Sequence, residues 1–159
     1  MSERAPVVDG GDLALIALLQ AVAVESERFS HRFGELNGLH RTDLNALVTI
    51  MEAERSGGPL SPTRLAASIG LSASATTALL DRLAASGHVE RVRSSGDRRR
   101  VTLVLSERAW KLGRRFFGPL GEAFGRRWTE LSEADRQVVA RFLSDAVSTM
   151  SRVRHGWDD

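Results

Sequence analysis

The sequence predicts a mainly α-helical fold that contains one short β-hairpin. Three observations support this: apolar residues recur at helical spacing in six stretches, capping residues or glycines bound most of these, and only residues 89–105 hold short β-type runs around a polar loop. The chain has 159 residues, 42% hydrophobic and 26% charged, which fits one globular domain. It has no cysteine, which excludes disulfides, thiol catalysis and cysteine-ligated metals.

The first helix is expected from about Asp12 to Phe33, and its early part is apolar on every side. A helix that is apolar all round must be covered all round, so we expect this segment to form a subunit interface. A second helix is expected from about Thr42 to Glu54, and the turn at residues 56–58 ends it.

The third and fourth helices have clear boundaries. Ser61 is a good N-cap, Pro62 suits the first helical position, and Gly70 ends the third helix. Ser72 can cap the fourth helix, which is expected to run to about residue 85, before Gly87.

The hairpin is expected at residues 89–93 and 101–105, with a charged tip at residues 94–100. Ser106 then caps a fifth helix to about residue 128, which Pro119 should kink or weaken. Ser132 and Asp135 resemble a capping box for a sixth helix. The apolar rows of that helix suit core or dimer contacts: Val138, Val139, Phe142, Leu143, Ala146, Val147 and Met150.

Two helices joined by a tight turn and followed by a basic hairpin are typical of a winged helix-turn-helix that binds DNA. The second of these helices would enter a major groove and present Ala73, Ser74 and Thr77 to the bases. Residues 82–115 hold ten basic and three acidic side chains, a net charge of +7 in a chain whose total is +2. A basic segment in an otherwise acidic chain is typical of a nucleic-acid binder.

The sequence resembles the MarR family of bacterial transcriptional regulators over residues 12–153. The motifs that carry the resemblance are residues 60–66 leading into 70–72, residues 76–83, residues 87–91, and above all Asp97-Arg98-Arg99-Arg100-Val101 followed by Leu103, Leu105 and Ser106. The last of these is similar to the family's wing motif. On this reading, residues 1–11 and 154–159 are flexible tails, residues 12–37 and 107–153 supply the dimerisation helices, and residues 42–106 form the winged helix-turn-helix.

The resemblance implies a homodimer that binds a pseudo-palindromic operator in double-stranded DNA, usually as a repressor. Many family members release DNA when a small aromatic or anionic ligand binds between the dimerisation helices and the DNA-binding lobe. Arg99 would be the wing arginine that reaches the minor groove, with Asp97 orienting it. The expected DNA contacts are Ser61, Thr63, Ser72, Ala73, Ser74, Thr76, Thr77, Arg82, Asp97, Arg98, Arg99 and Arg100. The expected ligand contacts are Phe29, Phe33, His40, Arg41, Trp110 and Phe117.

The same residues also fit other interpretations. The arginine tip could be a solvated loop, and Ser74 and Thr77 could lie on a plain helix surface. The aromatic residues could simply belong to the core, and His40 and Arg41 could be exposed connector residues. The protein could also regulate without a ligand, or be a small-molecule binding or enzymatic protein on the same scaffold. No catalytic constellation, metal site or cofactor motif rises above chance, and the longest apolar run, residues 13–24, is too short for a membrane span. We therefore expect a cytoplasmic protein that is not an enzyme.

Overall fold

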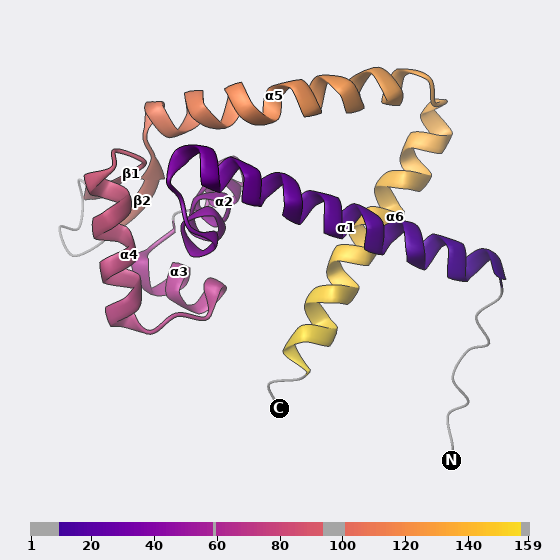
Figure 1. Cartoon of the computed structure of the whole chain (residues 1–159). Helices are drawn as coiled ribbons and strands as arrows, with labels where there is room; N and C mark the ends of the chain where they lie inside the picture. Colours follow the sequence, from indigo (N-terminus) through magenta and orange to yellow (C-terminus); the bar gives the residue numbers. More distant parts are fainter. Residues whose placement is uncertain (1–9, 59, 94–100, 157–159) are drawn as a thin grey trace, which may run out of the picture. The chain divides into compact units, whose positions relative to one another are not determined.

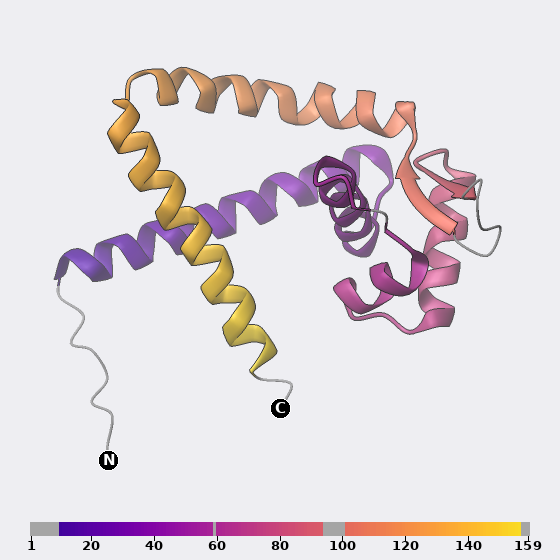
Figure 2. The same ribbon diagram turned by 180° about the vertical axis from the view of Figure 1, so that it is seen from behind.

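A computed structural model describes residues 10–58, 60–93 and 101–156, except for the side chains of residues 154 and 155. The described chain holds six helices and one antiparallel hairpin, which confirms the predicted fold class (Figures 1 and 2). The elements in chain order are α1 (Gly10–Asn37), α2 (Arg41–Arg55), α3 (Pro62–Ile69), α4 (Ala73–Ala85), β1 (Val89–Arg93), β2 (Val101–Leu105), α5 (Glu107–Thr129) and α6 (Glu133–His155). No helix within the described ranges is long and apolar enough to cross a membrane.

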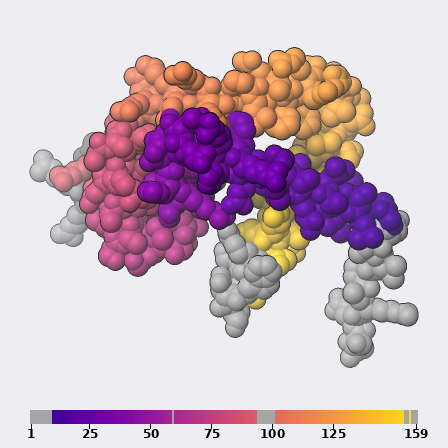
Figure 3. Space-filling model, viewed as in Figure 1, coloured from indigo at the N-terminus to yellow at the C-terminus, as the bar shows by residue number. Residues whose placement is uncertain are grey.

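The chain divides into two compact units, Met1–Leu112 and Gly113–Asp159, and the boundary lies inside α5. The first unit contains α1 to α4, the hairpin and the start of α5. The N-terminal half of α1 extends clear of α2, α3 and α4, as Figures 1 and 3 show. The second unit contains the rest of α5 and α6. Helix α5 continues through Pro119.

Local caps explain most of the helix boundaries. The Ser61 hydroxyl accepts a hydrogen bond from the Arg64 N–H at the start of α3, as predicted. Gly70 ends α3 in the left-handed region, with φ of 68°. The Ser72 and Ser106 hydroxyls cap α4 and α5 in the predicted way. Ser132 also caps α6, because its hydroxyl accepts a hydrogen bond from the Asp135 N–H at 3.1 Å. The same hydroxyl donates to Asp135 Oδ2 at 2.6 Å.

The core of the first unit is built from one face of each element between α2 and β2. Its most deeply buried apolar side chains are Ala46, Ile50, Leu65, Leu79, Leu80, Leu83, Val89 and Leu103. The outer edge of β2 is held by the chain before α3, because the Leu103 N–H donates to the Leu60 carbonyl at 2.8 Å. These contacts fix α3, α4 and the hairpin strands as one body.

Candidate nucleic-acid interface

Helix α4 presents an uncharged face at its N-terminal half. Ala73, Ser74 and Thr77 are exposed there, where sequence spacing placed the base-reading side chains. The Thr77 hydroxyl donates to the Ala73 carbonyl at 3.0 Å, and the Ser72 and Ser74 hydroxyls lie 3.1 Å apart. The opposite face of α4 is buried in the core. The helix is therefore held from behind while its short side chains face outward.

Thr76 does not belong to this exposed face, which corrects the prediction that it contacts DNA. Its side chain is only 2% exposed, and its hydroxyl donates to the Ser72 carbonyl at 2.9 Å. Thr76 follows Ser72 by one turn, on the side of the helix that packs against the core. Its role here is to fill the core and tie the first turn of α4 to its cap.

Two further predicted DNA contacts, Ser61 and Thr63, lie at the start of α3. Thr63 is exposed in the first turn, whereas Ser61 is half-buried and its hydroxyl is used as the N-cap. A cap hydroxyl retains a lone pair and a donor proton, so Ser61 can still bind a phosphate oxygen.

Arg82 is tied to α2 by a buried partner. Its Nη2 lies 2.5 Å from Oδ1 of Asp43, a residue that is only 1% exposed. The other oxygen, Oδ2, accepts the His40 N–H at 2.8 Å in front of the first turn of α2. The Arg82 side chain stays 51% exposed, so part of its guanidinium remains accessible. Arg82 was among the predicted DNA contacts, but its partner, which lies 39 residues away, was not predicted.

A second ion pair, which the sequence did not predict, lies on the exposed side of α4. Arg91 Nη2 of β1 donates to Asp81 Oδ1 at 2.7 Å. Neither residue was among the predicted DNA contacts. One sequence signal could have found Arg91: it lies two positions after the apolar residue Val89 in β1, so the two side chains share a face of the strand and Arg91 points toward the helices.

The hairpin strands that lead to the predicted wing pair as expected. Val89 lies opposite Leu105 and Arg93 opposite Val101 in the antiparallel register. The tip residues Asp97, Arg98, Arg99 and Arg100 lie outside the described residues. Their role in DNA contact stays a prediction.

His88 lies between α4 and β1 and is almost fully buried. Its Nδ1 lies 2.8 Å from the Ser86 hydroxyl. Burial lowers the pKa of His88, the charge of Arg108 lowers it further, and the carboxylate of Asp43 opposes the shift. The neutral ring is therefore favoured at the joint between α4 and the hairpin.

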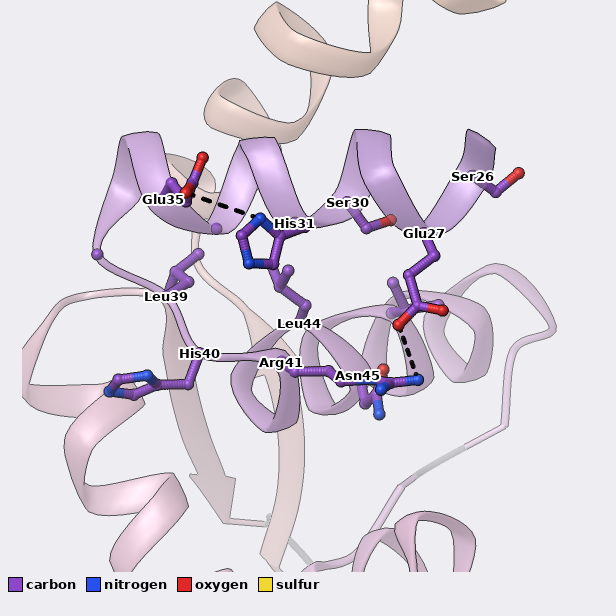
Figure 4. Close-up of a pocket in the computed structure, with 13 residues that line it drawn as sticks. Ser26, Glu27, Ser30, His31, Glu35, Leu39, His40, Arg41, Leu44 and Asn45 are labelled. Atoms are coloured by element: carbon purple, nitrogen blue, oxygen red, sulfur yellow. Dashed lines mark ion pairs between the residues drawn. The ribbon is translucent and has the colours of Figure 1, made fainter. Parts of the chain in front are cut away.

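A cavity of about 630 Å³ lies between α1 and α2 (Figure 4). Two ion pairs cross or border it: Arg41 Nη2 to Glu27 Oε1 at 3.0 Å, and His31 Nδ1 to Glu35 Oε1 at 3.8 Å. Its apolar lining comes from Leu39, Leu44 and Val48.

Only two of the six predicted ligand residues, His40 and Arg41, line this cavity. Phe33 is buried in the first unit, and the Trp110 indole N–H donates to Glu54 Oε2 at 3.1 Å. Phe117 lies in the second unit, edge to face with Phe116. The sequence could not separate these positions, because aromatic residues at helical spacing look the same whether they serve as core or as pocket.

Comparisons with known proteins identify relatives of this chain. A model of the MarR family matches residues 37–100. The chain is 30% identical over 135 residues to the uncharacterised HTH-type transcriptional regulator YcgE of Bacillus subtilis (strain 168), covering 85% of each chain. It is 25% identical over 116 residues to the transcriptional repressor MprA of Escherichia coli (strain K12), covering 73% of this chain and 65% of MprA.

Solved structures share the fold at lower identity. The S. aureus MepR–DNA complex matches with a TM-score of 0.55 and 17% identity, covering 84% of this chain and 98% of MepR. S. aureus MepR bound to ethidium bromide matches with a TM-score of 0.59 and 17% identity, covering 84% of this chain and 94% of MepR.

Proposed function

The chain belongs to the MarR family of transcriptional regulators, and we propose that it is a homodimeric repressor that binds a pseudo-palindromic operator and leaves it when a small molecule binds. The DNA-binding part rests on the exposed, uncharged N-terminal half of α4, together with the net charge of +7 that the sequence gives residues 82–115. Side chains this short let the helix backbone come close to base edges in a major groove about 12 Å wide. The role on chromosomal DNA agrees with the predicted cytoplasmic location.

The proposed DNA contacts come from three parts of the chain. Ala73, Ser74 and Thr77 would face the bases, while Ser61, Thr63 and Ser72 would bind phosphate oxygens at the helix starts. Arg82 supplies positive charge at the end of the recognition helix α4. At the hairpin tip, Asp97 would orient Arg99 into the minor groove, with Arg98 and Arg100 beside it.

The apolar surface of α1 and α6 supports a dimer. Large apolar side chains stay exposed on both helices in the single chain, among them Leu13, Leu18 and Val22 of α1, and Val138, Phe142, Val147 and Met150 of α6. Such an extent of exposed apolar surface is rare in a soluble monomer. A second copy would cover it and place two recognition helices about one DNA turn apart.

The cavity between α1 and α2 supports release by a small ligand. Its volume lies in the usual range for small-molecule sites, and it combines apolar residues with charged groups. An anionic ligand could replace Glu27 as the partner of Arg41. Because α2 also holds Asp43, a shift of α2 would reach Arg82 on the recognition helix through the ion pair.

Selection of DNA by the purified protein tests the proposal. Fragmented genomic DNA, captured and sequenced, should yield a pseudo-palindromic motif. The selected duplex should be bound by two chains in analytical ultracentrifugation. A protein that retards no genomic DNA even at low salt would contradict DNA binding. A thermal-shift screen of aromatic acids and cationic dyes would then test the ligand, since a compound that binds the folded state raises the melting temperature.

A further inference from the structure

We infer that Arg91 contacts a DNA phosphate beside the recognition helix and that Asp81 positions it. This inference rests on the proposed DNA binding and adds two residues to it. It starts from the short ion pair between α4 and β1, in which Arg91 Nη2 lies 2.7 Å from Asp81 Oδ1.

Asp81 lies on the same exposed face of α4 as the proposed base-reading residues. It follows Thr77 by one turn and Ser74 by two, and its side chain is 59% exposed. Residues 73–80 carry no charged side chain, so positive charge on this face must come from another element. The ion pair with Asp81 brings the guanidinium of Arg91 to this face.

The fold of the hairpin explains why Arg91 can reach α4. Arg91 shares a face of β1 with Val89, which is buried, and lies opposite Leu103, which is also buried. Side chains on one face of a strand point the same way, so the stem of Arg91 is directed toward the helices. The guanidinium ends in solvent next to Asp81, with the side chain 39% exposed. Long basic side chains commonly lie over apolar surface in this way while their charge stays in water.

The Asp81–Arg91 pair differs from the Asp43–Arg82 pair in the burial of its carboxylate and in the freedom of its guanidinium to bind a phosphate. Asp43 is buried and holds Arg82 against α2. Asp81 is itself exposed, and an exposed pair of this kind contributes little to folding stability. A guanidinium has five N–H donors, so Arg91 keeps donors for a phosphate while one nitrogen binds Asp81. The pair therefore suits orientation of a cation for DNA better than stabilisation of the fold.

The two possible roles of Asp81 predict opposite changes in the DNA affinity of Asp81→Asn. If its carboxylate only adds negative charge near DNA, Asp81→Asn should strengthen binding. If it holds Arg91 in place, Asp81→Asn should weaken binding although the variant is more positive. Charge alone cannot produce the second result.

The test measures binding of the full chain to the duplex that the wild-type protein enriches most from a random-sequence library, by fluorescence anisotropy from about 50 to about 200 mM salt. We expect Arg91→Gln to weaken binding about tenfold at the higher salt concentrations. The slope of log K against log salt should fall in magnitude by about 1.8 per dimer, since each lost phosphate contact removes about 0.9. Asp81→Asn should also weaken binding, and the double variant should bind no more weakly than Arg91→Gln.

A matched control lies on α1, where Arg28 Nη1 and Glu25 Oε1 form an exposed pair of the same length. Arg28→Gln should leave the salt slope unchanged, and thermal melting of each variant checks that it is folded. An unchanged slope for Arg91→Gln, or tighter binding by Asp81→Asn, would overturn the inference while specific DNA binding stands. Failure of the wild-type protein to enrich any duplex would instead overturn the proposed function, and this inference with it.

Discussion

The buried carboxylate of Asp43 binds two groups at once: the guanidinium of Arg82 on the recognition helix and the N–H of His40 in front of α2. The first contact joins residues 39 positions apart, and the second satisfies a backbone donor that would otherwise be unpaired. The Asp43 side chain thus caps the N-terminus of α2 and holds α4 against it.

Replacement of Asp43 by alanine should therefore destabilise the fold. The variant loses a charge-assisted hydrogen bond and a helix-start bond, and we expect a loss of roughly 2–4 kcal/mol from the two terms. Urea unfolding followed by circular dichroism measures it. In a double-mutant cycle with Arg82→Ala, the two changes should cost much less together than the sum of the single changes. Additive costs would show that the ion pair carries no coupling energy.

Glu54 should prove equally important for the hairpin. Its Oε1 accepts the Leu105 N–H of β2 at 3.0 Å, and its Oε2 accepts the Trp110 indole N–H of α5 at 3.1 Å. Glu54→Ala leaves two half-buried donors without this partner, which should cost about 2 kcal/mol in unfolding free energy. Glu52→Ala is the matched control, because Glu52 is exposed on the same helix, and it should change stability by less than about 0.5 kcal/mol. Equal effects of the two variants in urea unfolding would rule out the bridging role.

His88 should make the folded state less stable as the pH falls. Its pKa in the folded protein lies below the usual value of 6.5, mainly because the ring is buried. Below pH 6.5 the unfolded chain therefore binds a proton that the folded chain resists, so stability decreases from pH 6.5 downward to the folded pKa. Stability is not affected by this group above pH 6.5.

Replacement by glutamine should reduce this acid dependence, since the titrating ring is gone. Urea midpoints of the wild-type and His88→Gln proteins at about pH 7.5 and about pH 5.5 measure the difference. We expect the gap between the two midpoints to be smaller in His88→Gln. An equal gap in both proteins would show that another group controls the acid response.

Arg99 gives a test of the predicted wing. Arg99→Ala should weaken operator binding about tenfold at physiological salt, as expected for loss of a minor-groove arginine. Arg98→Ala, at the neighbouring position, is the matched control for charge and should weaken binding less. Unchanged operator affinity in Arg99→Ala, measured by the same anisotropy titration, would remove Arg99 from the proposed interface.

The elements could be predicted from the sequence because their boundaries are set by local chemistry. For example, the boundaries of α3 are set by Ser61, Pro62 and Gly70, which lie close together in the sequence. Each of them acts as expected. The first helix was expected to end at about Phe33, but α1 continues to Asn37 and contains Gly34. A side chain there would place Cβ 2.6 Å from the Leu39 carbonyl oxygen, so this glycine permits close approach of the chain and does not end the helix.

The candidate site could be predicted only in part, because its side-chain partners are distant in sequence. Spacing along α4 identified Ala73, Ser74 and Thr77 on the exposed face, but it did not distinguish Thr76, which the core covers. Asp43–Arg82 and Glu54–Trp110 join residues 39 and 56 positions apart. Such pairs depend on how the helices pack, and no local pattern encodes them.

The proposed dimer can be tested at α6, where one helix presents an apolar and a polar side. Val147 is 69% exposed in the single chain and belongs to the apolar rows, whereas Ser148, next to it, belongs to the polar side. Val147→Glu would bury a carboxylate in the proposed interface without a partner, at a cost of several kcal/mol per subunit. We expect this variant to sediment as a folded monomer at concentrations where the wild-type protein is a dimer, and to lose operator affinity because two half-sites are no longer bound together. Ser148→Glu adds the same charge on the polar side and should leave the dimer intact. A dimeric Val147→Glu variant would place the subunit interface elsewhere on the chain.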